Sequence, residues 1–173
     1  MALQTSVQLA VETDLTRTDG LASATATAPW SYGFQWPDGT AANTANRLYQ
    51  GRRTLAASAN EDLDLHGAAG TVLLTDSYGA TITFARIRAI VVKAAATNTN
   101  NVVVGGAATN TFVGPFGAAT HTISLPPDGF WMAVAPGTTG WAVTGATGDL
   151  LRVANSAAGT SVTYDIFLIG ASA

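Results

Sequence analysis

The chain has 173 residues, a formal net charge of −3, no cysteine and 11% charged residues, whereas an average soluble domain has roughly 25%. The absence of cysteine excludes a disulfide scaffold and a thiolate metal site. The eight Lys and Arg residues are too few to favour nucleic acid as the main partner. The length fits one domain, and the shortage of charge predicts that partner molecules cover part of the surface.

Neither a signal peptide nor a membrane span is expected. The N-terminal residues lack a basic start and an apolar run. The strongly apolar stretch at residues 89–92 ends at Lys93, far short of the ~20 residues that cross a bilayer. We therefore expect a soluble protein with no membrane partner.

Alternation of apolar and polar side chains is the dominant pattern, and the Ala-rich segments lack the apolar stripe of a helix. Gly and Pro turns separate the alternating segments. In chain order, the pattern predicts strands at residues 7–12, 53–57, 63–66, 87–92, 101–104, 121–125, 130–134, 150–155 and 162–168. Many short strands between such turns are typical of a sandwich or barrel. We predict an all-β fold, an antiparallel β-sandwich that is jelly-roll-like.

The N-terminal part differs from the rest of the chain. Residues 18–50 have the weakest pattern, with flanks rich in Thr, Ala and Asn. We predict that residues 1–45 form an N-terminal strand, an extended arm and long loops. Residues 46–173 are predicted to form the sandwich core, and the whole chain one compact domain.

One pattern within the N-terminal part is sharp. Trp30, Tyr32, Phe34 and Trp36 alternate with Ser, Gly and Gln, so an extended backbone places the four aromatic side chains on one face. Three interpretations stay open: a core strand that fills the sandwich, an anchor for a partner subunit, and a platform on which sugar rings stack. We favour the core strand over the anchor, and the anchor over the platform.

An acidic segment offers a candidate metal site. On a strand, Asp62, Asp64 and His66 point to one side, and Leu63 and Leu65 to the other. Oxygen and nitrogen ligands on one face suit a metal ion. Any half-buried strand shows the same alternation, however, and the sequence identifies no further ligand. We favour the interpretation as an ordinary half-buried strand, and we predict no metal site and no cofactor.

Patterns of catalytic residues are weak. His66 and His121 occur without a G-x-S-x-G nucleophile elbow. The two glutamates, Glu12 and Glu61, each have an Asp neighbour and suit a solvated face better than the carboxylate pair of a glycosidase. The pair Gly105-Gly106 has neither a following helix nor a nearby Lys, so it predicts a hairpin turn and not a phosphate loop. We predict no catalytic residue and no enzyme activity.

Basic residues gather in two places along the chain. Arg52 and Arg53 are adjacent, and Arg86 and Arg88 share a strand face. Arg86 and Arg88 could pair across an interface with the acidic Glu61-Asp62 segment, or they could lie at a solvated sheet edge. The candidate interface residues are the four aromatic residues named above together with Arg52, Arg53, Arg86 and Arg88.

Several segments together carry a resemblance to a known group of proteins. They are residues 53–65, 74–79, 82–93, 104–107, 148–151 and 164–170. Over about residues 46–170 the chain resembles small virion structural proteins of tailed bacteriophages. The resemblance implies an all-β, non-enzymatic, oligomeric protein that is assembled on the particle, at the capsid surface, the neck or the tail.

The low charge agrees with such a role, because a capsid decoration (cement) protein stabilises the head by adding buried contact area and needs no reactive site. We predict a decoration protein that is made in the host cytoplasm and lies on the virion, with the capsid surface favoured. Its predicted partners are the major capsid protein or other virion proteins, and its own copies in a homo-oligomer, with a trimer favoured. The alternatives are a neck or tail structural protein, a tail-borne receptor- or carbohydrate-binding module, and a small glycan-degrading enzyme.

Overall fold

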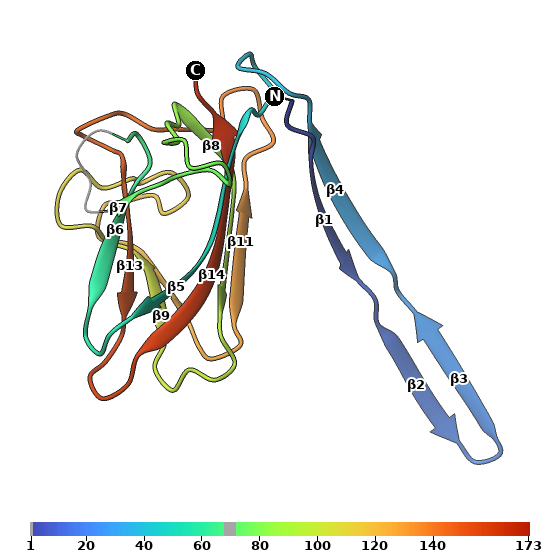
Figure 1. The fold of residues 1–173 in the computed structure, drawn as a ribbon. Coiled ribbons are helices and arrows are strands. Elements are labelled where there is room, and N and C mark those ends of the chain that lie inside the picture. Colours follow the sequence, from blue (N-terminus) through green and yellow to red (C-terminus); the bar gives the residue numbers. More distant parts are fainter. Residues whose placement is uncertain (1, 68–71) are drawn as a thin grey trace.

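The computed structural model describes residues 2–67 and 72–173, which contain strands and no helix. The predicted all-β class is confirmed. Figure 1 shows a sandwich of sheets and a long two-stranded ribbon that projects from one end of it. The strands are β1 (Thr5–Val11), β2 (Asp14–Asp19), β3 (Ala22–Thr27), β4 (Trp30–Trp36), β5 (Arg47–Leu55), β6 (Asn60–Asp64), β7 (Val72–Leu73), β8 (Arg86–Ala94), β9 (Val102–Gly105), β10 (Thr122–Leu125), β11 (Phe130–Val134), β12 (Trp141–Ala142), β13 (Leu150–Asn155) and β14 (Val162–Ala171).

Two sheets form the sandwich. One has the strand order β10-β9-β13-β6-β7, and the other has the order β11-β8-β14-β5, with β12 also paired to β8. Four antiparallel pairs are nested along the chain: β5 with β14, β6 with β13, β8 with β11 and β9 with β10. The short pairing of β6 with β7 is parallel. Nested antiparallel pairs of this kind occur in double-sheet folds built from Greek keys, and the jelly-roll-like topology stays a prediction.

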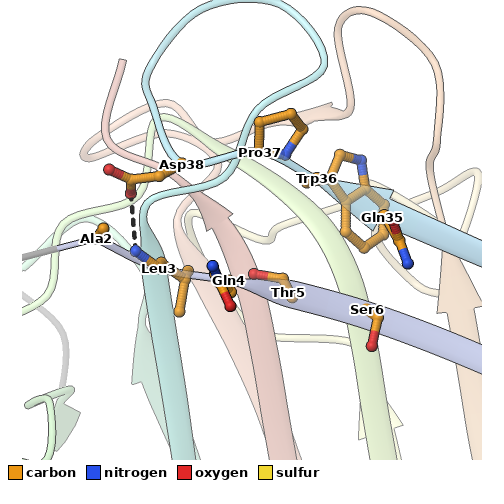
Figure 2. A pocket seen from close by; sticks show the side chains of 9 residues that line it. All are labelled: Ala2, Leu3, Gln4, Thr5, Ser6, Gln35, Trp36, Pro37 and Asp38. Carbon is orange, nitrogen blue, oxygen red and sulfur yellow. Dashed lines mark hydrogen bonds between the residues drawn. The ribbon is translucent and has the colours of Figure 1, made fainter.

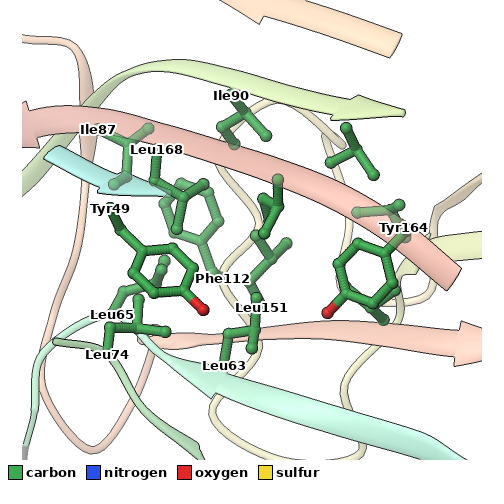
Figure 3. Close-up of a cluster of buried hydrophobic side chains, with 14 of the residues drawn as sticks. Tyr49, Leu63, Leu65, Leu74, Ile87, Ile90, Phe112, Leu151, Tyr164 and Leu168 are labelled. Atoms are coloured by element: carbon green, nitrogen blue, oxygen red, sulfur yellow. The ribbon is translucent and has the colours of Figure 1, made fainter. Parts of the chain in front are cut away.

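The main core lies between the two sheets (Figure 3). Strand β14 shows how alternation builds it, because Ile166 and Leu168 are completely buried while Phe167 between them is 43% exposed. Leu63 of β6 and Leu151 of β13 belong to the same cluster and come from the opposite sheet. Each fully buried Leu or Ile contributes roughly 1.5–3 kcal/mol relative to an exposed one. The sandwich therefore has a core of its own.

Residues 5–36 form the ribbon, which is a single long hairpin (Figure 1). Strand β1 pairs with β4 and β2 pairs with β3, both antiparallel. The register continues through both pairs without a shift, from Thr5 opposite Trp36 to Asp19 opposite Ala22. Gly20 at the tip has a φ of 60°, a conformation that glycine adopts without steric cost.

The prediction of long loops within residues 18–50 is wrong for β3, whereas the aromatic segment, interpreted above as extended, forms β4. Strand β3 alternates Ala with Ser and Thr and has no large apolar side chain, so its period-two pattern is hidden. Hydroxyl groups link it to β2 instead. Thr16 Oγ1 lies 3.1 Å from Thr25 Oγ1, and the Thr27 hydroxyl donates to the Asp14 carboxylate at 2.6 Å.

A second, smaller apolar cluster attaches the ribbon to the sandwich. It lies on the outer face of the sheet β11-β8-β14-β5, where buried Trp36 packs and where Phe34 and Val7 contact its edge. The sheet contributes to it one row of cross-strand neighbours, Leu48, Ile169, Ala89 and Val134. The base of the ribbon is therefore fixed by apolar packing.

Arg88 also fixes the base of the ribbon, from inside the protein. Its side chain is completely buried. Burial lowers the pKa of Arg88, and the nearby Arg86 guanidinium lowers it further. The prediction that Arg88 lies at a subunit interface is wrong, because its guanidinium donates to carbonyl oxygens of its own chain, those of Thr44, Gly137 and Thr138.

A register shift in β14 accounts for the direction of Arg88. Ile169 lies opposite Ala89 and Gly170 lies opposite Ile87, so Arg88 has no cross-strand neighbour in β14. Glycine is required at position 170, because a Cβ there would lie 2.2 Å from the carbonyl oxygen of Arg86. Irregularities of this kind redirect a side chain, and this one directs Arg88 toward the loops beside the ribbon.

Candidate interaction surface

The aromatic side chains of β4 share one face of the ribbon, and their exposure changes along it. Trp36 at the base is 3% exposed, Phe34 is half-buried, and Tyr32 and Trp30 are 56% and 53% exposed. Neighbouring rings contact each other, with centroids 6.0 Å apart for Trp30 and Tyr32 and 4.6 Å apart for Tyr32 and Phe34. The aromatic row therefore begins in the small cluster and continues into solvent.

Strand β1 extends this apolar surface, because side chains directly opposite each other share one face of an antiparallel pair. Three such pairs are Val7 with Phe34, Leu9 with Tyr32, and Val11 with Trp30. The continuous register adds Leu15 of β2, which is 74% exposed. We call this surface the ribbon face, and it comprises Val7, Leu9, Val11, Leu15, Trp30, Tyr32 and Phe34.

The other face of the ribbon is polar and includes Gln8, Ser31, Asp14 and Thr25. An amphipathic antiparallel sheet normally packs its apolar side on a core, and an isolated two-stranded hairpin is marginally stable in water. Among the described residues, the sheet covers the ribbon face at its base, and Trp30 and Tyr32 stay more than half exposed. Such exposure of contiguous apolar side chains is typical of an interaction surface.

The favoured prediction of a sandwich core strand is wrong for Trp30 and Tyr32. Strand β4 pairs with β1 in a separate two-stranded sheet, so its aromatic face does not enter the space between the two large sheets. Trp36 is buried, but in the small cluster on the outer side of a sheet. The remaining interpretations, a partner anchor and a sugar platform, both require the exposure that the outer two rings have.

A hollow beside the ribbon base is shown in Figure 2. The Asp38 carboxylate accepts a hydrogen bond of 3.0 Å from the backbone N–H of Leu3, which ties the N-terminal segment to the turn after β4. Asp38 is the single ionisable side chain of the lining, so the hollow lacks the carboxylate pair of a glycosidase. The lining residues are Ala2, Leu3, Gln4, Thr5, Ser6, Gln35, Trp36, Pro37 and Asp38.

Arg52 lies on the outer face of the sheet β11-β8-β14-β5, with its side chain 74% exposed. Its guanidinium donates two hydrogen bonds to the Asp165 carboxylate, at 2.7 and 2.8 Å. These hydrogen bonds hold the pKa of Asp165 below its ordinary value of 3.8. Arg52 is thus accessible to a partner, and its interface role stays a prediction.

Arg53 points to the other side of the same sheet and is partly buried. Its guanidinium donates to one oxygen of the Glu61 carboxylate, and the Tyr164 hydroxyl donates to the other at 2.7 Å. Burial, together with the hydrogen bond to Glu61, raises the pKa of the Tyr164 phenol. Both oxygens of Glu61 are therefore bonded within the chain, and the interface role of the partly buried Arg53 stays a prediction.

Asp62 is paired within the chain as well. It accepts two hydrogen bonds of 2.8 Å from Arg152 of β13, the strand next to its own. The predicted pairing of the Glu61-Asp62 segment with Arg86 and Arg88 is therefore wrong, because nearer arginines occupy both carboxylates. Arg86 is half-buried at the start of β8, and its interface role stays a prediction.

The segment predicted as a candidate metal site closes a turn. Leu63 and Leu65 are completely buried, as the alternation predicts, but Asp64 is completely buried too. One Asp64 oxygen accepts hydrogen bonds from the backbone N–H groups of His66 and Gly67, at 2.9 and 2.8 Å. Within residues 2–67 and 72–173, no group of three His, Asp or Glu side chains could hold a metal ion.

Both histidines take part in loop packing. The Nδ1 atom of His66 is buried, and the ring packs so closely on Gly145 that a Cβ there would lie 2.7 Å from it. His121 was expected on the polar face of a strand, but it precedes β10, and its Nδ1 lies 2.6 Å from the carbonyl oxygen of Phe116. The two rings thus hold loops at different places in the sandwich.

The strand predicted at residues 7–12 corresponds to β1, but its pairing with β4 in one hairpin was not predicted, although the sequence contains signals for it. Val7, Leu9 and Val11 alternate in the same way as the aromatic residues of β4. Gly20-Leu21 lies midway between the two segments, and Gly at the first position of a two-residue loop is a hairpin signal. Together they predict one hairpin with an apolar face. The burial of Arg88 has no comparable local signal.

Comparison of the chain with protein-family models, with curated proteins and with solved structures gives no match. In the described part of the chain, no helix has the length and apolar character needed to cross a membrane. Among the described residues, the ribbon face is the surface whose exposed aromatic side chains point most directly to a function.

Proposed function

We propose that this chain is a structural protein of the virion of a tailed bacteriophage, and specifically a capsid decoration protein. The exposed ribbon face carries the proposal, because exposed Trp and Tyr side chains on a projecting element are typical anchors for another protein. The resemblance of about residues 46–170 to small virion structural proteins supplies the biological setting. The proposed role needs contact surface and no catalytic residue.

The two parts of the chain have different tasks in this role. The sandwich supplies a rigid body with its own core. The ribbon supplies reach, since its long strands from Thr5 to Asp19 extend roughly 50 Å at about 3.3 Å per residue. It can therefore contact a molecule beyond its own sandwich. On a capsid, buried contact of this kind between neighbouring subunits opposes the pressure of the packaged DNA.

We place the protein on the capsid surface in preference to the neck or tail, because a single small domain suits a position that is repeated many times. Its partners there are the major capsid protein and further copies of itself, with a trimer as the favoured homo-oligomer. The chain's low charge, 11% of residues, fits a molecule whose surface is largely covered in the assembly.

The test uses phage particles that lack this protein. Purified chain is added, unbound protein is removed by sedimentation, and the particles are imaged by electron microscopy. We expect density at many equivalent positions on the capsid, and DNA release at a higher temperature than from bare particles. The double variant W30S/Y32S is expected to bind weakly, whereas Ser31→Ala on the polar face binds like the unmodified chain. Density confined to the neck or tail contradicts decoration, and no binding contradicts the virion role.

A carbohydrate-binding module is the second candidate, favoured by the ring geometry. Trp30 and Tyr32 are stacked with an angle of 22° between their planes, and both are exposed. Sugar rings pack on such apolar platforms. A glycan array tests this candidate: binding that Trp30→Ala abolishes supports it, and no binding contradicts it. Ser31→Ala is the matched control, because Ser31 lies on the same strand but on the polar face, outside the platform.

A further inference from the structure

We infer that the ribbon face binds a second copy of this chain, on the outer face of its sheet β11-β8-β14-β5. The inference rests on the proposed function, in which the ribbon is an assembly surface, and it names the partner of that surface. It follows from apolar contacts within one chain, from the surfaces that those contacts leave uncovered, and from the distribution of charge.

The ribbon already packs on this sheet within a single chain. At its base, Trp36, Phe34 and Val7 lie against the row of the outer face that contains Ile169 and Ala89. The ribbon face and the outer sheet face are therefore complementary in chemistry. This contact ends at the base, since Leu9 and Tyr32 are not part of the cluster, and Figure 1 shows the ribbon extending away from the sandwich.

The next row of the same outer face is apolar and uncovered. Phe167 of β14 lies between Gln50 of β5 and Val91 of β8, with Met132 of β11 beyond it. Phe167 is 43% exposed, and Phe130 in the following row is 61% exposed. We call this surface the sheet patch, and it comprises Val91, Phe130, Met132 and Phe167.

A second copy supplies what each chain lacks. One chain has an apolar ribbon face that is uncovered beyond its base, and an apolar sheet patch that its own ribbon leaves bare. When the ribbon of one copy lies on the sheet patch of the next, it makes the same kind of apolar contact that the base of the ribbon makes with the sheet of its own chain. Such head-to-tail contacts between unlike surfaces close into a ring when the rotation permits, and a ring of three is the favoured trimer.

Charge favours a sandwich over another ribbon as the partner surface. Residues 1–38 contain four acidic and one basic side chain, a net charge of −3, while residues 39–173 contain seven of each sign. Two ribbons packed face to face bring together like net charges, which repel. A ribbon on the neutral sandwich avoids this repulsion, because Arg52 and Lys93 in the row next to Phe167 are paired with Asp165 and Asp128 of their own chain.

The first experiment uses the purified full chain without phage particles, so that its failure is separate from failure to bind capsids. Sedimentation equilibrium over a range of micromolar concentrations is expected to show a homo-oligomer. The double variant W30S/Y32S is expected to raise the dissociation constant about tenfold or more, as truncation of buried interface aromatics does. Ser31→Ala on the polar face is the control and leaves the constant unchanged. Circular dichroism verifies that each variant keeps its sheet content.

The second experiment locates the contact by cross-linking, which is clean because the chain has no cysteine. Tyr32→Cys and Phe167→Cys are prepared as separate chains, mixed and oxidised, so that any disulfide between the two positions joins two copies. Both native side chains are exposed, so the substitutions spare the core. We expect a covalent dimer from this mixture, and little dimer when Ser31→Cys replaces Tyr32→Cys.

Each other outcome overturns the inference. A monomer at all concentrations leaves the ribbon face to a different virion protein, and capsid binding then still supports the proposed function. An oligomer in which Tyr32→Cys joins mainly to itself shows ribbon-on-ribbon packing. An oligomer that W30S/Y32S does not weaken shows that the copies associate through another surface.

Discussion

The sandwich and the ribbon are both built from antiparallel strands with alternating side chains, but their apolar faces have different neighbours. In the sandwich, each of two sheets covers the apolar face of the other, and side chains such as Leu63 and Leu151 are completely buried. In the ribbon, a single two-stranded sheet has a cover at its base alone among the described residues, and Trp30 stays 53% exposed. Alternation therefore identifies an apolar face without identifying what covers it.

The difference has a consequence for stability. The sandwich is expected to unfold as one cooperative unit, because its core links both sheets. The ribbon depends on Trp36 and on the loops that Arg88 holds, so it is expected to open locally at lower free energy than the sandwich. An element of that kind gains most from a partner, because the partner supplies the cover that the chain lacks.

The largest effect is expected from a core substitution in the sandwich. Phe112→Ala removes a completely buried ring between the sheets and should lower the free energy of unfolding by about 3–5 kcal/mol. Urea denaturation followed by circular dichroism measures the change. Phe130→Ala is the matched control, because this ring is 61% exposed and its loss should cost less than about 0.5 kcal/mol in the monomer. An equal loss of stability in the two variants would contradict the burial of Phe112 and the exposure of Phe130.

The next effect is expected where the ribbon meets the sandwich. Arg88→Met leaves three carbonyl oxygens, those of Thr44, Gly137 and Thr138, without their charged donor, and should cost about 3 kcal/mol. Amide hydrogen exchange should rise most in β1, β4 and the loop before β5. Arg86→Met is the control and should affect those amides little, since Arg86 is only half-buried. An equal increase in amide hydrogen exchange across the ribbon and the sandwich would instead show that Arg88 stabilises the whole fold.

A smaller effect is expected within the ribbon. Trp36→Ala should cost about 2 kcal/mol, because Trp36 is 3% exposed in a cluster smaller than the main core. Trp30→Ala should cost less than about 0.5 kcal/mol in dilute monomeric protein. Hydrogen exchange of the ribbon amides and thermal unfolding measure both. A large loss from Trp30→Ala in the monomer would mean that its own chain covers Trp30.

The smallest effect is expected at the sheet surface and depends on pH. The pKa of Asp165 is lowered by the hydrogen bonds from Arg52, so the pair stabilises the fold above the ordinary aspartate pKa of 3.8. This contribution is lost as the pH falls through the lowered pKa. In thermal melts, Arg52→Gln should therefore be slightly less stable than the unmodified chain at neutral pH, and the difference should disappear as the pH falls below the lowered pKa of Asp165. A difference that persists in acid would exclude the ion pair as its cause.

Local pattern was sufficient for most of the sandwich. The alternation in β14 predicts which side is buried, and Tyr164 and Ile166 are completely buried as expected. It was insufficient for the ribbon because β3 has small side chains that resemble a loop in sequence. It was also insufficient for Arg88, whose burial depends on a register shift in β14, far from it in the chain.

The sequence by itself determined the all-β class, the alternation of side chains along the main strands and the presence of four aromatic residues on one face. These properties follow from local backbone geometry and from side-chain period. Only the tertiary structure decided that β4 pairs with β1 outside the sandwich, that Glu61 and Asp62 are bonded within the chain, and that Phe167 lies in the row next to the ribbon base. Those outcomes depend on which strands become neighbours, and strand pairing joins residues that are distant in sequence.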